Sequence, residues 1–242
     1  MNGMKAKNGG GGVCTKEKLN QPYAIGYGSR GSVCSWNNYA IKQIHTTKFL
    51  DISQINDHAL YEFEKEQNCQ IAIANALSKE VREQFTTLLH NEDLTKVTAA
   101  FTKNCGQGSY IIQKLCLGDT LECIIDKNTK IPGIIKLTAI SILTVLSELH
   151  VKGYTHGDIH IRNIMLCEGQ IKLIDFGACH TKIENFKNDI TRLKEVLTSL
   201  LIVDDDITLI NAFQVDKSAV DILTAIKFGG RNRRFLSLLT TP

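Results

Sequence analysis

The sequence predicts an α+β fold in two lobes, with short strands near its beginning and mostly helices after them. Residues 23–44 alternate in polarity and are rich in glycine and aromatic residues, as expected for strands joined by tight turns. Residues 132–150 repeat apolar side chains at helical spacing, and about the last 50 residues are mostly helical in pattern. Because strands come first and helices later, the two kinds of element should segregate, as in α+β proteins.

The first elements are a tail and a small set of strands. The four consecutive glycines from Gly9 to Gly12 predict a flexible tail over residues 1–18, because glycine loses the most backbone entropy on ordering. Asn37 and Asn38 suit a hairpin turn between two strands within residues 23–44.

A long helix follows, with Asp57 as a candidate N-cap. Its apolar face is formed by Leu60, Phe63, Cys69, Ile73 and Leu77. Ser78 is expected to cap a second helix that runs to about residue 89. Residues 97–101 and 109–115 then have the composition of two strands.

The second half opens with a helix over residues 132–150, and Pro132 suits its start. One face of this helix is formed by Ile135, Ala139, Ile142, Leu146 and Leu149. Residues 164–166 and 171–174 are predicted to be short strands, and no internal repeat interrupts the series.

Composition excludes several classes of protein. The 242 residues are 43% hydrophobic and 22% charged, as in soluble globular proteins, and no apolar run reaches the length of a membrane-spanning helix. A net charge of +3 is too small for a dedicated nucleic-acid-binding domain. The N-terminus lacks the apolar region of a secretory signal peptide, although some export systems read other signals. The eight cysteines form no CxxC pair, which favours reduced thiols in a cytoplasmic protein.

The segment with the clearest chemistry covers residues 154–177. Asp158 is followed five positions later by Asn163, and Asp175 begins the sequence Asp-Phe-Gly. Phosphoryl transfer needs a carboxylate that orients the attacking hydroxyl group and hard oxygen ligands that hold Mg²⁺. Asp158 suits the first role, whereas Asn163 and Asp175 suit the second. A turn between two short strands would bring the three side chains together.

This segment resembles the protein-kinase superfamily, whose catalytic loop reads H-x-D-x-x-x-x-N and is followed by D-F-G. The resemblance runs in order over about residues 20–200. It implies ATP and Mg²⁺ as cofactors, a smaller lobe of one antiparallel sheet plus one long helix, and a mostly helical, truncated larger lobe. The implied boundaries are residues 1–18 for the tail, 19–116 for the smaller lobe and hinge, and 117–242 for the larger lobe.

A glycine-rich stretch earlier in the chain carries the same resemblance. It has the family's G-x-G-x-x-G-x-V pattern, in which the backbone approaches the phosphates closely. The nucleotide-binding residues implied here are Gly26, Gly28, Ser29, Gly31 and Val33.

The next strand resembles the family's V-A-I-K strand. Ala40 would contact the nucleotide and Lys42 would neutralise the α- and β-phosphates, which makes Lys42 both a binding and a catalytic candidate. A carboxylate on the following helix must position Lys42. Glu66 fits the family's F-x-x-E pattern, and Glu62 and Glu64 are alternatives.

Residues 113–121 resemble the kinase hinge. By that resemblance Gln113 is the gatekeeper, and the Lys114 carbonyl and the Cys116 N–H read the adenine edge.

Two further side chains near Asp158 are catalytic candidates. His160 stands where aminoglycoside-type kinases often carry histidine, and Arg162 stands where tyrosine kinases carry arginine. Either cation would offset charge on the transferring group. A structural hydrogen bond within the loop is the competing interpretation for each.

Two departures from the family pattern concern regulation. Gly157 replaces the arginine that usually receives an activation-loop phosphate, which predicts activity without that phosphorylation. Asp189, which resembles the aspartate that opens the central helix of the larger lobe, follows Asp175 by only 14 residues. A full activation segment and its A-P-E motif do not fit in that interval, so the usual peptide-docking platform is missing or rebuilt.

The sequence therefore predicts a minimal ATP- and Mg²⁺-dependent protein kinase for Ser or Thr, with Tyr as an alternative. It resembles the secreted bacterial effector kinases of the OspG/NleH and HopBF types, which implies virulence, a host protein substrate, action in the host cytoplasm and, in some cases, a host activating partner. The H-G-D-x-H-x-x-N pattern also resembles small-molecule kinases of the aminoglycoside and choline types, and a catalytically inactive binding module is the third hypothesis.

Overall fold

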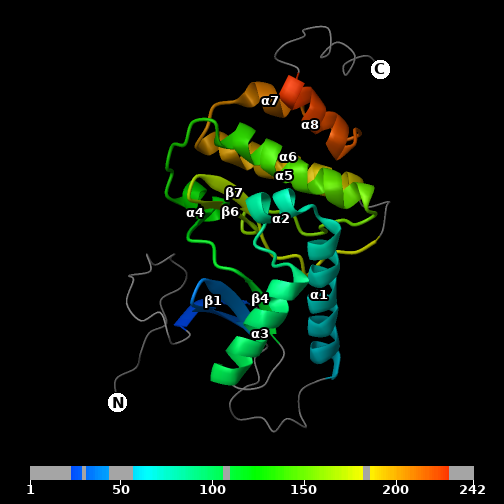
Figure 1. The fold of residues 1–242 in the computed structure, drawn as a ribbon. Coiled ribbons are helices and arrows are strands. Elements are labelled where there is room, and N and C mark those ends of the chain that lie inside the picture. Colours follow the sequence, from blue (N-terminus) through cyan, green and yellow to red (C-terminus); the bar gives the residue numbers. More distant parts are fainter. Residues whose placement is uncertain (1–22, 29–30, 44–56, 106–109, 182–185, 229–242) are drawn as a thin grey trace.

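The computed structural model describes residues 23–28, 31–43, 57–105, 110–181 and 186–228. Strands dominate its beginning and helices its second half, which confirms the predicted α+β class. The four-stranded sheet lies with α1 and α3 at one end of the molecule, and α5 to α8 lie at the other (Figure 1). The lobe boundaries stay a prediction, and the predicted tail over residues 1–18 lies outside the described residues.

The larger sheet is antiparallel, with strand order β1-β2-β3-β4. Its members are β1 (Tyr23–Gly28), β2 (Gly31–Trp36), β3 (Tyr39–Gln43) and β4 (Tyr110–Lys114). Asn37 and Asn38 form the turn between β2 and β3, and Asn37 has a φ of 53°, a left-handed value that asparagine tolerates better than most residues. The predicted hairpin turn is therefore confirmed.

Three helices separate β3 from β4: α1 (Asp57–Ala76), α2 (Lys79–Phe85) and α3 (Asn91–Cys105). Ser78 caps α2 as predicted, by accepting the Val81 N–H. The helix ends at Phe85 rather than near residue 89, because Thr86 is extended and bridges Leu173.

The predicted strand over residues 97–101 is wrong, because this segment lies inside α3. Val97 and Phe101 are four residues apart, so they occupy one helical face, and both are buried against Trp36 and Tyr110 of the sheet. Acidic residues in the first turn and Lys103 in the last favour the helix dipole. A short run of β-branched and aromatic residues resembles a strand when viewed alone.

The rest of the chain contains a three-stranded sheet, β5-β6-β7, surrounded by helices. Its strands are β5 (Gly118–Thr120), β6 (Ile164–Cys167) and β7 (Gln170–Leu173). The helices are α4 (Leu121–Asp126), α5 (Ile134–Val151), α6 (Phe186–Ser199), the 3-10 turn η3 (Leu200–Ile202), α7 (Ile207–Ala212) and α8 (Ala219–Phe228).

Helix α5 forms the centre of the main hydrophobic core, where it packs against α2, α6 and α8. Its 18 residues have a mean hydropathy of 1.7, which by length and composition alone would allow it to span a membrane. Ten of its side chains are buried in the protein, as expected for a core helix.

Four of the cysteines in the described residues are paired, which corrects the expectation that the thiols are reduced. Cys69 of α1 is joined to Cys179, and Cys116 to Cys167 at the end of β6. Their Cα atoms lie 6.3 Å and 5.8 Å apart, within the usual range for disulfides. The partners are 110 and 51 residues apart in sequence, so no local spacing pattern reveals them.

Candidate active site

The register of the larger sheet gathers predicted nucleotide-binding residues on one face. Lys42 lies opposite Val33, and Ala40 lies opposite Gln113. Because opposed residues share a face and alternate residues along a strand repeat it, these four side chains all point to the same side of the sheet. The opposite face carries Ile41 and is covered by α3.

Lys42 forms an ion pair with Glu66 of α1, which decides among the three predicted carboxylates. Glu66 is only 1% exposed, so this carboxylate is largely removed from water. Glu64 is exposed, and the side chain of Glu62 lies outside the described part. A pair of this kind fixes the lysine ammonium group on one face of the sheet, while the Lys42 side chain stays 21% exposed.

Gly177, the last residue of Asp-Phe-Gly, packs directly on Glu66. A Cβ atom at this position would lie 2.7 Å from the Glu66 Cδ atom, closer than real contacts allow. The glycine therefore permits α1 to approach the segment that carries Asp175. It brings the ion pair of the larger sheet next to the predicted Mg²⁺-binding segment that follows β7.

The predicted catalytic loop has a compact set of hydrogen bonds. The Asn163 side-chain amide donates to both the backbone carbonyl and the Oδ2 atom of Asp158, at 3.0 Å each. Asn163 is buried, whereas the Asp158 carboxylate is 49% exposed. This arrangement orients an accessible carboxylate, as a base that must meet a hydroxyl group requires.

The two predicted Mg²⁺ ligands flank the β6–β7 hairpin. The Ile174 N–H donates to the Asn163 carbonyl at 2.9 Å, so the residue before β6 lies beside the residues after β7. Asp175 has a left-handed φ of 57°, and its Oδ1 atom accepts the Gly177 N–H at 3.2 Å. Because the Asn163 nitrogen is used on Asp158, its Oδ1 atom is available as a ligand. Two hard oxygen donors fit Mg²⁺, which usually completes its shell with substrate phosphates and water.

Asp189 of α6 holds the base of the catalytic loop. This buried carboxylate accepts the backbone N–H groups of His156 and Gly157 at 2.9 Å each and lies 3.0 Å from His150 Nε2. Burial alone would raise the pKa of Asp189, but these bonds together hold the pKa below its usual value. The carboxylate is thus kept charged where it fixes the loop backbone.

His156 is fully buried and has a structural role, because its ring meets Phe176 edge-on at 4.9 Å and its Nδ1 atom accepts the Asp158 N–H. Burial lowers the pKa of His156 despite the carboxylates nearby. The neutral imidazole therefore joins the catalytic loop to Asp-Phe-Gly.

Of the two further catalytic candidates, the structure brings one to Asp158. His160 Nε2 lies 3.3 Å from the Asp158 carboxylate, and its Nδ1 atom accepts the Arg162 N–H. The Arg162 side chain is exposed and lies 3.9 Å from Glu122 of α4. Catalytic roles for both residues stay predictions.

The predicted hinge connects β4 to β5. Gln113 and Lys114 end β4, and the Lys114 N–H donates to the Thr87 carbonyl. Cys116 is held by its bond to Cys167, and its contact with adenine stays a prediction. Among the glycine-rich residues, Gly28 pairs with Gly31 across β1 and β2, and Gly26 pairs with Val33. Ser29 lies outside the described residues.

Comparison with known proteins agrees with this geometry. A family model described as "Protein kinase domain" matches residues 19–200. The chain belongs to the protein kinase family. It is 26% identical over 172 residues to the serine/threonine-protein kinase pakA of Talaromyces marneffei and 37% identical over 78 residues to the serine/threonine-protein kinase MST20 of Pyricularia oryzae.

The match to pakA covers 69% of the kinase chain but 24% of that relative, and the match to MST20 covers 32% and 8%. The kinase therefore spans a minor part of the length of both proteins. The matches indicate a shared kinase domain and give no information on the remainder of either relative.

Sequence reasoning missed one group of residues in this kinase. Gln70 and Thr87 both hydrogen-bond to the Gln113 side chain, although neither was singled out. The available signal was that Gln70 follows Glu66 by one helical turn and so shares its face of α1.

Proposed function

We propose that this kinase transfers the γ-phosphoryl group of ATP to a Ser or Thr hydroxyl group of protein substrates, with Tyr as the alternative acceptor. The observation that carries the proposal is the simultaneous presence of the Lys42–Glu66 ion pair and the Asp158–Asn163 bonds in one structure. The names of the relatives support Ser or Thr as the acceptor.

Each residue has a physical role in such a transfer. Lys42, fixed by Glu66, neutralises the phosphates, and the glycines of β1 and β2 let the backbone approach them. Asp158 orients the attacking hydroxyl group and accepts its proton. Mg²⁺, held by Asn163 and Asp175, would supply charge neutralisation on the phosphate oxygens. His160 beside Asp158 supplies a further positive charge when it is protonated.

The assay is transfer of labelled phosphate from ATP to a mixture of proteins. Asp158→Asn and Lys42→Met should each lower the rate by about 100-fold or more, the usual contribution of such groups. The matched controls are Asp216→Asn and Lys79→Met, since both residues are exposed. A Lys42→Met variant that labels protein at the wild-type rate would contradict the proposal.

The same assay distinguishes the alternatives. ATP consumption that rises with an aminoglycoside or choline, without labelled protein, would identify a small-molecule kinase. Binding of ATP without transfer to any acceptor would identify an inactive binding module. The match of the protein kinase family model favours the protein substrate.

We further propose that the kinase is an effector that acts on host proteins in the host cytoplasm. The support is the sequence resemblance to secreted bacterial effector kinases and the short interval of the activation segment, since α6 begins at Phe186, soon after Asp175. Phosphosite mapping in eukaryotic cells that express either the wild type or Asp175→Ala tests this. New phosphosites restricted to the wild type support it, whereas identical phosphoproteomes contradict it.

Activity without activation-loop phosphorylation is part of the same proposal. Gly157 has no side chain that could bind an activation-loop phosphate, and its backbone N–H already donates to Asp189. A phosphatase-treated kinase should retain its full rate. If the purified chain is slow and a host protein accelerates it, the predicted activating partner is supported, and full speed of the chain alone contradicts that partner.

A further inference from the structure

The Gln113 side chain connects the end of β4 to α1. Its Nε2 atom donates to Gln70 Oε1 at 2.8 Å, and its Oε1 atom accepts the Thr87 hydroxyl at 2.6 Å. Gln113 shares a sheet face with Ala40 and Lys42, so it borders the predicted adenine site. One amide group therefore joins the nucleotide side of the sheet to the helix that carries Glu66.

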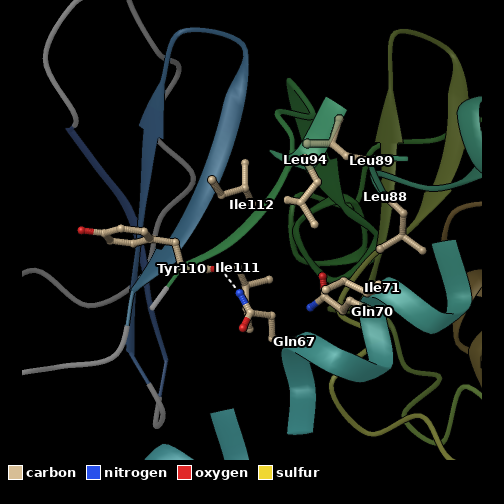
Figure 2. A pocket seen from close by; sticks show the side chains of 9 residues that line it. All are labelled: Gln67, Gln70, Ile71, Leu88, Leu89, Leu94, Tyr110, Ile111 and Ile112. Carbon is tan, nitrogen blue, oxygen red and sulfur yellow. Dashed lines mark hydrogen bonds between the residues drawn. The ribbon is translucent and has the colours of Figure 1, made fainter. Parts of the chain in front are cut away.

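Gln70 lies one turn after Glu66 on α1, and both side chains are buried. Figure 2 shows Gln67 and Gln70 reaching from α1 toward β4, where Gln67 donates to the Tyr110 carbonyl at 2.9 Å. The bond from Gln113 to Gln70 thus lies one helical turn from the Lys42–Glu66 pair, and both interactions tie α1 to the same face of the sheet. Loss of this bond would let α1 move away from β3.

Burying the Gln70 amide costs free energy that packing alone would not require. Its Nε2 atom is buried and has no hydrogen-bond partner among the residues that the structure describes. The pocket beside it has a volume of about 20 Å³, enough for about one water molecule. An apolar side chain of the same length would avoid the unpaired donor. The acceptor end of Gln70, rather than its packing, explains its presence.

We propose that Gln70 is a positioning residue for phosphoryl transfer: by accepting from Gln113, it holds α1 so that Glu66 orients Lys42. The inference rests on the proposed kinase function of the site. It also couples the predicted adenine side of the sheet to the ion pair, because Gln113 lies opposite Ala40 and hydrogen-bonds to the helix that carries Glu66.

The test is a double-mutant cycle with Gln70→Met and Gln113→Met, in which methionine keeps the side-chain length without the amide. Gln70→Met alone should lower kcat by about ten-fold, the effect of losing one buried bond that orients a catalytic pair. In the Gln113→Met background the same change should alter kcat less than about two-fold, since the bond is already absent. Asn68→Met, on the exposed side of α1, is the matched control and should leave kcat unchanged.

A purely structural role predicts a different result. In that case Gln70→Met lowers the melting temperature, but kcat measured well below that temperature stays at the wild-type value. That result, or an equal loss of kcat in both backgrounds, would overturn the proposal. If the wild type transfers no phosphate at all, the proposed function fails, and the cycle is measured on the Kd for MgADP, which should show the same coupling through Lys42.

Discussion

The Asp189 carboxylate accepts the backbone N–H of Gly157 at 2.9 Å, which ties the start of α6 to the residue before Asp158, the predicted catalytic base. The second oxygen of the same carboxylate accepts the His156 N–H and meets His150. One carboxylate thus accepts two backbone N–H groups of the loop that have no backbone partner among the described residues. Its loss would leave donors unpaired in the core.

Asp189→Asn should therefore destabilise the protein by about 3 kcal/mol. The asparagine amide has one acceptor oxygen, and its NH₂ group would face a backbone N–H group that needs an acceptor. Urea unfolding measures the change in the free energy of unfolding. Asp216→Asn, at an exposed position, should change it by less than about 0.5 kcal/mol. Equal stability of the two variants would mean that Asp189 does not support the loop.

Acid should destabilise the protein in two stages. Burial lowers the pKa of His156 below its ordinary value of 6.5. Below pH 6.5 the unfolded chain therefore binds more protons than the folded chain, and the free energy of unfolding falls as the pH drops. The pKa of Asp189 lies below its ordinary 3.8, so its contribution is present above 3.8 and is lost as pH falls through the folded pKa. Melting temperatures from pH 8 to pH 3 measure both stages. His156→Phe should flatten the first, and an unchanged slope in that variant would refute the assignment.

Gly157→Arg should abolish activity rather than add regulation. Gly157 has a φ of 81°, and a Cβ atom there would lie 2.5 Å from the Ala178 carbonyl oxygen. Both the backbone strain and the clash fall next to Asp158. Soluble yield, melting temperature and transfer rate check the prediction. An active, stable Gly157→Arg protein would contradict the loop geometry.

Removal of the Cys69–Cys179 bond should cost stability. A disulfide that closes a loop of about 100 residues stabilises the folded state by about 4.7 kcal/mol in the chain-entropy description. The variant Cys69→Ala/Cys179→Ala should unfold at lower urea concentration, and Cys123→Ala, outside both pairs, is the control. Alkylation of the native chain followed by mass spectrometry counts the thiols. If alkylation labels both Cys69 and Cys179 without prior reduction, the bond is absent.

Much of the fold could be predicted, and so could the grouping of the candidate catalytic residues in one site, because their signals are local. The hairpin turn at Asn37, the cap at Ser78 and the spacing from Asp158 to Asp175 are each contained in short segments. Residues 97–101 were mispredicted because the sheet against which Val97 and Phe101 pack is formed partly by the distant β2 and β3, which supply Trp36 and Ile41. The cysteine pairs and the bond from Gln113 to Gln70 also join distant segments, and nothing local encodes them.

The two faces of the four-stranded sheet differ in what they contact. Trp36, Ile41 and Ile112 are packed under α3, while Lys42 and Gln113 are on the catalytic face. The apolar face of the sheet is already covered by α3, so it is not accessible to a protein partner that would activate the kinase. The outward side of α1, where Tyr61 and Asn68 are exposed, is accessible to such a partner instead.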